Sequence, residues 1–485
     1  MSLEPLRRLH ASAPDPVARA LAARPIPIRG EPLLRAAFPW WCGPRFRSTA
    51  AILEAARTWT PQQVTSYQLS QLRVILGRTA ARTATFRRLL REAEFDGGGL
   101  GCIDDLSRLP LMDKAALRDV AREAREAQPG VPARLQRTGG TSSSPAEFDE
   151  PRDAWAFEKA FFSAWYRGRG VVPGDRMVTV SGTFGRRVVA YNPITNELNL
   201  YVKEFTNAVG DELVSRIVGF DPRMIRGYPS LLYLLASHVL KRGRTLTLPR
   251  LTAVFLSSEQ ILPYQVAAIE QAFQAPVSSH YGQSERIAFI QQCTRGPLLH
   301  VAELYSYVEF LKEDGSLATD DGDLAMIVGS SFANTVTPLI RYKTDDWVLV
   351  AAGDRCPDCR RYVRSVKSIE GRTGDFIVSP SGRRWSPTVL EFAIRNARHL
   401  REICLVQSDL SSVDVLVVPD DGYAADDGQS FVHELEKRIG EPTMSFRLVE
   451  TSNIPRPRSQ KQRFVVSKIA GESARLGVTQ GGHGE

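Results

Sequence analysis

Apolar and polar positions follow two different patterns along the middle of the chain. Short apolar runs at residues 176–181, 251–257 and 276–279 have the composition of buried strands. Residues 229–241 and 263–273 lie between these runs and are predicted to be helices. Strands that are separated by helices are typical of an α/β architecture with partly parallel sheets.

From about Leu299 the apolar period shifts towards two residues. Residues 300–311, 322–328 and 347–351 alternate in this way, which predicts antiparallel strands. We therefore expect the first domain to combine mixed sheets flanked by helices with a smaller β-rich subdomain.

The last hundred or so residues are predicted to form a separate, small α+β unit. Its expected elements are helices at 386–396 and 430–439 and strands at 402–406, 413–418 and 444–449. The boundary is expected at Gly371–Asp375, which divides the chain into an N-terminal domain of residues 1–370 and a C-terminal domain of residues 371–485.

The first hundred residues are expected to be a helical N-terminal region. Residues 1 to about 65 have no clear period, whereas residues 66–94 repeat apolar side chains at helical spacing among arginines. Residues 66 to about 94 are therefore predicted to be helical.

Composition narrows the class of protein. The chain has 485 residues, 43% of them hydrophobic and 24% charged, which predicts two to four globular domains. No apolar run reaches the roughly 18 residues of a membrane span, and six cysteines in this length indicate a reducing, cytoplasmic setting rather than a disulfide scaffold. The net charge of +8 is scattered, so we expect an anionic small molecule rather than nucleic acid as the partner.

A run of glycines and hydroxyl side chains, Arg137-Thr-Gly-Gly-Thr-Ser-Ser-Ser-Pro145, is the strongest chemical signal. Glycines let backbone N–H groups approach an anion closely, and hydroxyls add further donors. The residues that would contact phosphate are Thr138, Gly139, Gly140, Thr141, Ser142, Ser143 and Ser144. The run has no lysine, so a phosphate there needs a cation from elsewhere; a flexible linker is the alternative interpretation.

Two later segments carry groups that suit a nucleotide. His280–Glu285 combines an aromatic ring, Tyr281, that can stack on a base with a carboxylate, Glu285, that can hold magnesium. Asp346 follows an apolar stretch and can accept both hydroxyls of a ribose. Taken alone, each of these segments has a simple alternative in a turn or a solvated carboxylate.

Two basic residues complete the set. Arg372 lies in Gly371-Arg-Thr-Gly-Asp375 at the expected domain boundary, as a hinge next to a charged ligand would require. Only ten of the 62 basic residues are lysines, and one of them, Lys461, lies in a polar loop near the C-terminus. A solvated surface lysine is the alternative at that position.

In this order, the motifs resemble the core motifs of the adenylate-forming enzymes, the superfamily of acyl-coenzyme A synthetases, peptide-synthetase adenylation domains and luciferases. The segments that resemble the phenylacetate–coenzyme A ligase branch are Gly227–Ser230, Ser258–Glu259, Pro338–Tyr342 and the surroundings of Cys293. The resemblance covers about Thr138 to Lys468, and residues 1 to about 100 match only loosely.

The resemblance implies a role for each of these positions. The loop at 138–144 would hold the β- and γ-phosphates of ATP, and Ser258, Glu259 and Gln260 would border the adenine, with Tyr281 against its face and Gly282 and Ser284 beside it. Glu285 would coordinate magnesium, Asp346 would bind the ribose, and Arg372 would reach the ribose or a phosphate. Asp375 would be the hinge, and Lys461 would contact the substrate carboxylate and the α-phosphate.

The implied reaction is ATP-dependent activation of a carboxylic acid, aromatic by resemblance, to an acyl-adenylate, followed by transfer to a thiol, with coenzyme A as the first candidate. A carrier protein or an amine is the alternative acceptor, and a non-catalytic nucleotide- or acyl-binding relative is the alternative class. Three positions depart from the family pattern, because Ser258, Asp345 and Gln460 stand where the family has glycine.

Four further residues form a set of zinc-ligand types. Cys293 and His300 are followed by Cys356 and Cys359, the latter two as a Cys-x-x-Cys pair. Three thiols and one imidazole are a complete tetrahedral set for a structural zinc ion. A redox dithiol or unrelated buried cysteines are the alternatives.

Overall fold

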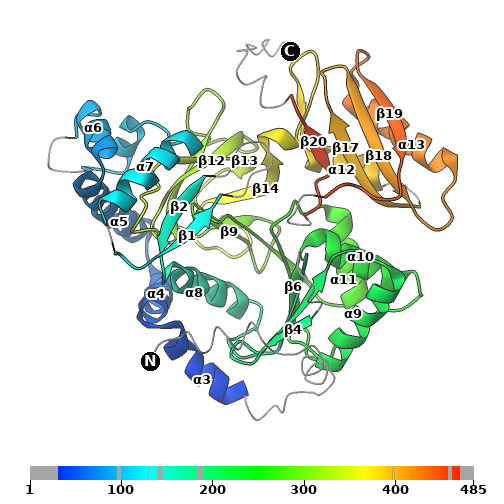
Figure 1. Cartoon of the computed structure of the whole chain (residues 1–485), viewed down its shortest axis with the longest axis horizontal. Coiled ribbons are helices and arrows are strands. Elements are labelled where there is room, and N and C mark those ends of the chain that lie inside the picture. Colours follow the sequence, from blue (N-terminus) through cyan, green and yellow to red (C-terminus); the bar gives the residue numbers. More distant parts are fainter. Residues whose placement is uncertain are drawn as a thin grey trace.

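The computed structural model describes residues 31–95, 100–128, 130–138, 146–182, 189–395, 397, 399–456 and 461–469. Its centre is a sheet of twelve strands in the order β11-β12-β13-β14-β10-β9-β8-β7-β6-β3-β5-β4 (Figure 1). Five of these strands are mutually parallel, and β4 runs antiparallel at the edge: β3 (Met177–Gly182), β4 (Val189–Asn192), β5 (Glu197–Val202), β6 (Met224–Gly227), β7 (Ala253–Ser257) and β8 (Val277–Gly282). This half confirms the predicted α/β fold class.

Helices cover both faces of the parallel strands. In β7, Val254 and Leu256 pack into the cluster that contains α9 (Asn207–Phe220), α10 (Pro229–Leu240) and α11 (Pro263–Phe273). Phe255, between them, faces α8 (Ala154–Arg167) on the opposite side. Because strands covered on both faces need apolar residues at successive positions, β7 appears in the sequence as a continuous apolar run.

The other half of the sheet is antiparallel. It consists of β9 (Phe289–Gln292), β10 (Leu299–Val301), β11 (Ser306–Leu311), β12 (Leu324–Ser331), β13 (Tyr342–Ala351) and β14 (Ser365–Arg372). The single strand predicted over 300–311 is wrong in one respect, because a turn closed by the Tyr305 N–H and the Ala302 carbonyl, 2.8 Å apart, separates β10 from β11. Both strands are buried, so the apolar pattern continues across that turn.

The N-terminal part is helical, with α3 (Glu31–Cys42), α4 (Pro44–Ala55), α5 (Pro61–Arg82), α6 (Ala84–Glu92), α7 (Lys114–Glu126) and two short 3-10 turns, η2 (Ala56–Thr58) and η3 (Asp104–Arg108). The helical segment predicted over residues 66–94 forms two helices, α5 and α6, because Thr83 between them has an extended backbone (φ −123°, ψ 129°). The Thr85 hydroxyl and N–H beyond the break both bind the Glu123 carboxylate of α7. A long-range partner therefore fixes the start of the second helix.

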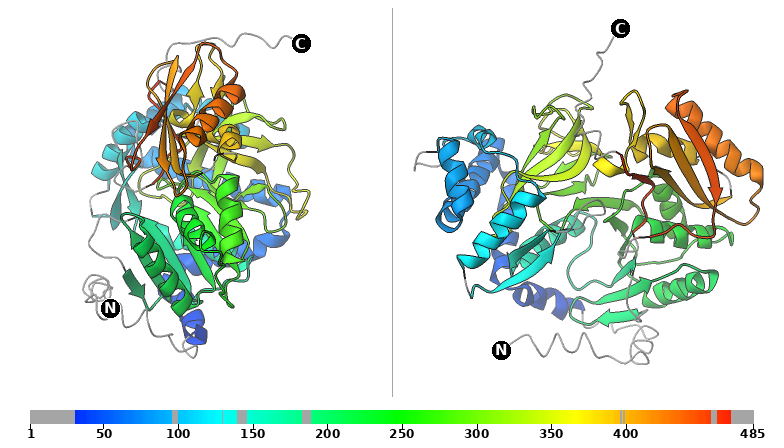
Figure 2. Two further views of the ribbon diagram at one scale, coloured as in Figure 1. Left: turned by 90° about the vertical axis from the view of Figure 1, so that its right-hand side faces the viewer. Right: turned by 45° about the horizontal axis from the view of Figure 1, so that its top comes forward.

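The C-terminal segment builds a sheet of its own, in the order β19-β18-β17-β20. After η4 (Thr373–Asp375) come β15 (Ile377–Val378), β16 (Arg384–Trp385), α12 (Pro387–Arg395), β17 (Leu400–Gln407), β18 (Ser412–Pro419), α13 (Ala425–Ile439), β19 (Ser445–Glu450) and β20 (Val465–Ser467). Figure 2 shows this unit beside α10 and α11, and Leu262 at the start of α11 belongs to its hydrophobic core. Among the described helices, none is both long and apolar enough to cross a membrane.

One buried ion pair joins the N-terminal helices to the antiparallel strands. The Arg341 guanidinium donates to both oxygens of Glu309 at 2.9 and 3.0 Å and to the carbonyls of Ser107 and Leu109. Both charged side chains are less than a tenth exposed. Each charge therefore needs the other as its partner, because neither side chain is exposed enough to be solvated by water.

We expect Arg341→Met to lower the free energy of unfolding by about 3–5 kcal/mol, because it leaves Glu309 buried and ionised without a partner. Chemical denaturation measures this loss. The double variant Arg341→Met with Glu309→Leu should recover part of the lost free energy of unfolding. As a control, Arg447→Met, which removes the exposed ion pair with Asp414, should leave the free energy of unfolding nearly unchanged. A single variant as stable as the parent would contradict the prediction.

Candidate functional site

The two strands that flank the glycine–hydroxyl run pair with each other. Strands β1 (Ala133–Arg137) and β2 (Glu147–Pro151) are antiparallel, and the pairing continues to Thr138 and Ala146. The Thr138 hydroxyl, which is buried, accepts the Ala146 N–H at 2.9 Å and so closes the base of the loop. Of the predicted phosphate-binding residues, Gly139, Gly140, Thr141, Ser142, Ser143 and Ser144 lie outside the described residues.

Three parallel strands end at one edge of the sheet and place the nucleotide motifs there. Gly227 ends β6, Ser258 follows β7, and Gly282 ends β8. The carboxyl ends of parallel strands are where α/β sheets bind ligands, because successive loops converge there. At Gly227 a Cβ atom would lie 2.4 Å from the Val180 carbonyl oxygen, so a larger residue cannot occupy this position without a shift of the backbone.

Ser258 and Asp345, two positions where the family pattern has glycine, adopt left-handed backbone conformations. Their φ angles are +76° and +62°. Glycine takes such angles without steric cost, and other residues take them with strain. The two departures therefore keep the turn while changing the residue; the third, Gln460, lies outside the described residues.

Glu259 connects the strand ends to the C-terminal unit. Its carboxylate accepts the Ser230 N–H at 2.9 Å and the Ser230 hydroxyl at 3.1 Å, and it accepts the Gln462 N–H at 2.8 Å. Burial raises the pKa of this carboxyl. Gln462 follows Lys461 directly, so Glu259 holds the segment that carries the predicted catalytic lysine.

Gln260, predicted at the adenine, also bridges to the C-terminal unit. Its amide Nε2 donates to the Ile369 carbonyl at 3.3 Å and to the Thr388 hydroxyl of α12 at 3.1 Å. Contact of Ser258, Glu259 and Gln260 with adenine stays a prediction.

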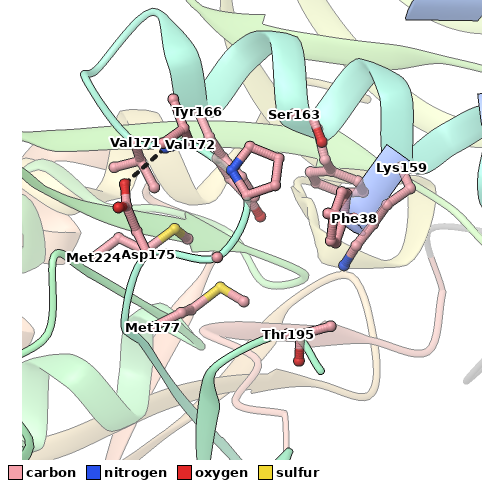
Figure 3. Close-up of a pocket in the computed structure, with 13 residues that line it drawn as sticks. Phe38, Lys159, Ser163, Tyr166, Val171, Val172, Asp175, Met177, Thr195 and Met224 are labelled. Atoms are coloured by element: carbon pink, nitrogen blue, oxygen red, sulfur yellow. Dashed lines mark hydrogen bonds between the residues drawn. The ribbon is translucent and has the colours of Figure 1, made fainter. Parts of the chain in front are cut away.

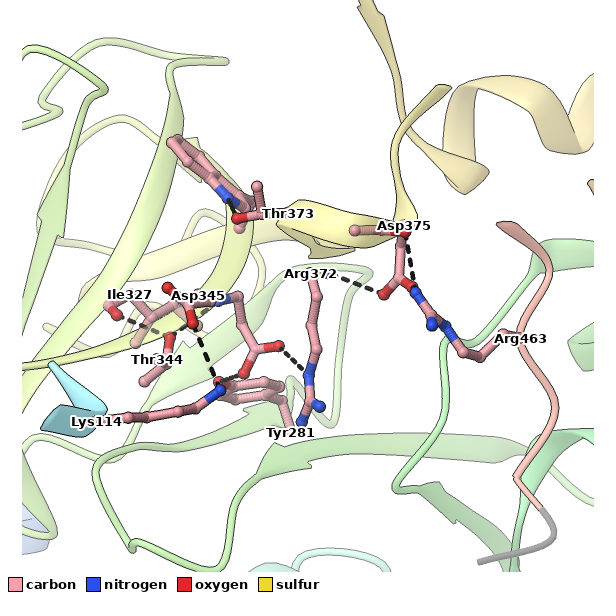
Figure 4. Close-up of polar contacts among 12 residues, drawn as sticks. Lys114, Tyr281, Ile327, Thr344, Asp345, Arg372, Thr373, Asp375 and Arg463 are labelled. Carbon is pink, nitrogen blue, oxygen red and sulfur yellow. Dashed lines mark hydrogen bonds and ion pairs between the residues drawn. The ribbon is translucent and has the colours of Figure 1, made fainter. Parts of the chain in front are cut away.

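Tyr281, Asp346 and Arg372 form a hydrogen-bonded group (Figure 4). The Tyr281 hydroxyl donates to Asp346 Oδ2 at 2.7 Å, and Arg372 Nε donates to Asp346 Oδ1 at 3.2 Å. Burial raises the pKa of Asp346, and the Asp346 carboxylate raises the pKa of Arg372. The structure thus brings the residue predicted to bind ribose against the one predicted to stack on the base.

Lys114 is a residue that the motifs did not identify. It begins α7, and its Nζ lies 3.7 Å from Asp345 Oδ2, next to the ribose-site aspartate (Figure 4). The one sequence signal that pointed to Lys114 was the rarity of lysine in this chain, which has only ten. It supplies a cation on the same side as Asp346.

Glu285 fits the predicted magnesium site in its chemistry. The carboxyl is 7% exposed, and burial raises its pKa to about 7, with the charge of nearby Asp346 adding to the shift. Two carboxylates that repel each other in a buried space offer the oxygen ligands that Mg²⁺ prefers. Gly282 and Ser284, on the loop that leads to Glu285, are exposed.

Asp375, the predicted hinge, is held by groups on both of its sides. It accepts the Arg372 N–H at 2.9 Å and the Arg463 Nε–H at 2.9 Å (Figure 4). Arg463 also donates to the Gly374 carbonyl at 2.9 Å. Gly371, which directly precedes Arg372, has a backbone φ angle of +101°, a value that favours glycine.

Lys461 reaches the same site from the C-terminal segment. Its Nζ lies 5.8 Å from the centre of the Tyr228 ring, at the end of β6. Burial lowers its pKa, while the Glu259 carboxylate acts in the opposite direction. The structure therefore brings together Lys461, Glu259, Asp346 and Arg372, which are far apart in the sequence.

The four predicted zinc ligands also meet. Sγ of Cys293 lies 3.9 Å from Sγ of Cys356, and Sγ of Cys359 lies 3.9 Å from Nε2 of His300. All four ligand atoms lie within 4.8 Å of one another. Burial lowers the pKa of His300 to about 4, which keeps a neutral nitrogen available to a metal.

Known proteins are similar to this chain in sequence and in fold, although no family model matches the chain. It is 25% identical over 408 residues to the phenylacetate–coenzyme A ligase of Pseudomonas putida, a match that covers 80% of this chain and 90% of the relative. It is 25% identical over 348 residues to protein CapK of Staphylococcus aureus, covering 68% and 74%.

Among solved structures, 2-hydroxyisobutyryl-CoA ligase in its postadenylation state has a TM-score of 0.68 at 19% identity, covering 86% of this chain and 92% of that one. The same ligase in the thioesterification state has a TM-score of 0.55. Sequence and fold together show that the chain resembles the adenylate-forming enzymes, and among them the phenylacetate–coenzyme A ligase branch.

Proposed function

We propose that the protein is an AMP-forming carboxylate ligase, which converts a carboxylic acid and ATP into an acyl-adenylate and then transfers the acyl group to the thiol of coenzyme A. The observation that carries the proposal is the position of Lys461, buried beside Glu259 and within electrostatic reach of Asp346 and Arg372. The relatives named above as coenzyme A ligases support the class of reaction and the thiol acceptor.

The chemistry explains why these groups are needed. A carboxylate is a weak electrophile, so one of its oxygens attacks the α-phosphorus of ATP, and the bond to the pyrophosphate oxygen breaks. Negative charge builds up on the α-phosphate in the transition state. The Lys461 ammonium, held where burial excludes water, would stabilise that charge.

The remaining residues would bind and orient the nucleotide. Asp346 would accept the ribose hydroxyls, Arg372 would lie beside the ribose or a phosphate, and Tyr281 would face the base. Magnesium held by Glu285 would neutralise part of the phosphate charge.

The structure has the higher TM-score with the postadenylation form of 2-hydroxyisobutyryl-CoA ligase, 0.68 against 0.55 for the thioesterification form. We propose that residues 371–485 move as a C-terminal domain against residues 1–370, with rotation about Asp375 between the two half-reactions. The Arg463–Asp375 ion pair would then hold the arrangement in which Lys461 is in the site.

ATP–pyrophosphate exchange tests the proposal. Purified protein is incubated with labelled pyrophosphate and a panel of aryl and fatty acids, with aromatic acids as the first candidates because of the phenylacetate ligases. We expect acid-dependent exchange, and an acyl-coenzyme A product by mass spectrometry when coenzyme A is added. Exchange without a thioester would indicate a carrier protein or an amine as acceptor, and nucleotide binding without exchange for any acid would contradict the enzyme reading.

We also propose that Lys114 contributes a cation to the phosphates, because the loop at 138–144 has none. Lys114→Gln is expected to lower kcat/KM for ATP by about tenfold, the effect of losing one charge-assisted contact. Lys114→Arg keeps the charge and should retain most of the activity. Equal kcat/KM values in the parent and the glutamine variant would refute this role.

We further propose that Cys293, His300, Cys356 and Cys359 bind a structural zinc ion, for which three thiolates and one imidazole are a complete ligand set. The ion would fasten the loop around Cys356 and Cys359 to β10 and to the end of β9. A reducing, cytoplasmic setting suits free thiols that serve as ligands.

A further inference from the structure

A cavity lies on the α8 side of the parallel strands (Figure 3). Its volume is about 40 Å³, and it is partly open to solvent. Apolar walls come from the rings of Phe38, Phe162 and Tyr166 and from Met177 and Met224. Lys159, Ser163, Thr195 and Asp175 are the polar side chains that face it.

Lys159 extends from α8 into this cavity without a partner (Figure 3). In the part of the chain that the structure describes, its ammonium makes no hydrogen bond and has no carboxylate within 4.0 Å. Burial lowers its pKa, as expected for a cation that lacks a counter-charge. A cation in such a place favours an anion as ligand.

The carboxylates around Lys159 are engaged with arginines. Glu197 accepts Arg226 Nη2 at 2.6 Å and the Thr179 hydroxyl at 2.5 Å. Asp175 binds Arg35 at 2.5 Å and lies 3.4 Å from Arg223.

Glu158, next to Lys159 on α8, accepts the Tyr305 hydroxyl at 2.8 Å and lies 3.3 Å from Arg286. Near Lys159, the opposite charges of Arg226 and Glu197 cancel in their ion pair. The ammonium therefore adds one uncompensated positive charge to the cavity wall.

The cavity lies at the amino-terminal ends of the parallel strands, and the nucleotide motifs lie at their carboxyl-terminal ends. Met177 and Met224 are the first residues of β3 and β6, whereas Gly227 and Gly282 are the last residues of β6 and β8. All of these strands are parallel. A molecule in the cavity is therefore separate from one at the ends of the strands.

We propose that this cavity is a second ligand site, which binds a short-chain monocarboxylate. The carboxylate pairs with the Lys159 ammonium and the Ser163 hydroxyl, and the apolar body packs among the rings and the two methionines. A single cation matches one carboxylate better than a phosphate ester with two charges, and the apolar wall matches a hydrocarbon body.

Residue-resolved labelling of lysines tests this proposal without turnover. The full-length protein, without ATP, is methylated with formaldehyde and a borane reductant, and peptide mass spectrometry reads each lysine separately. We expect acetate or propionate to slow the modification of Lys159 by about tenfold, the effect of a buried charge-assisted contact. Propionamide, of the same shape as propionate but neutral, should not protect. Lys461 reports the strand-end site in the same digest, and the exposed Lys203 reports general reactivity.

Variants provide an independent measurement. The acid should raise the melting temperature of the parent and of Lys159→Arg, but not of Lys159→Met, and Lys203→Met serves as the matched control. Lys159 modified at the same rate with and without acid, or equal protection by propionamide, would overturn the proposal. Loss of ATP–pyrophosphate exchange with every acid in a stably folded Lys159→Met variant would make the cavity part of the first site and would also overturn it.

Discussion

Replacement of Lys461 by alanine is expected to lower ATP–pyrophosphate exchange by roughly 10²–10³-fold, the effect of removing one preorganised group that stabilises transition-state charge. The loss should appear in kcat more than in KM, because the charge on the α-phosphate grows as the transition state forms. Exchange at the parental rate in this variant would remove Lys461 from the mechanism.

The same variant should fold at least as well as the parent at neutral pH. The pKa of Lys461 is lowered by burial, so its protonated form costs stability below the folded pKa, and this cost fades only as the pH rises from the folded pKa towards the unfolded value. Alanine removes the cost. Lys468→Ala is the matched control, because Lys468 is exposed in the same segment. Its exchange rate and melting temperature should equal those of the parent.

Replacement of Cys356 and Cys359 is expected to have the second large effect, a loss of bound zinc and of thermal stability. The purified parent should contain about one equivalent of zinc, and Cys356→Ser with Cys359→Ser should contain none. Structural zinc contributes directly to folding, so the melting temperature of the double variant should fall by roughly 10 °C. Metal analysis and calorimetry on the same samples measure both effects.

Cys102→Ser is the control for the zinc experiment, because Cys102 is an exposed thiol far from the cluster in sequence. It should keep the metal and the melting temperature of the parent. A strong chelator should reproduce the double variant when added to the parent. Less than half an equivalent of any metal in the parent would contradict the four-ligand site.

Local pattern was enough to predict most of the elements. The strands around Val254 and Val415 and the helices that begin at Pro229 and Pro263 appear close to their predicted bounds. Each is covered by other elements on one or both faces, so its apolar period reflects its own burial. The order of the motifs was likewise sufficient to predict the family resemblance, because each motif is a continuous segment.

Elements that depend on distant partners were not predicted correctly. The break at Thr83 follows from the bond between Thr85 and Glu123, and β20, which pairs with β17, has only three residues. Neither feature changes the apolar period in its own segment. Sequence pattern therefore could not locate them.

By itself, the sequence determined the α/β class, the order of the chemical motifs and the two pairs of candidate zinc ligands, because each element, motif or pair is a property of residues close together in the chain. Only the tertiary structure decided which groups meet: Lys461 with Glu259, Arg463 with Asp375, and Lys114 with Asp345. It also decided that Lys159 faces a cavity without a counter-charge. The physical reason is that electrostatic contact depends on distance in space, and chain folding brings together residues whose separation in sequence carries no information about that distance.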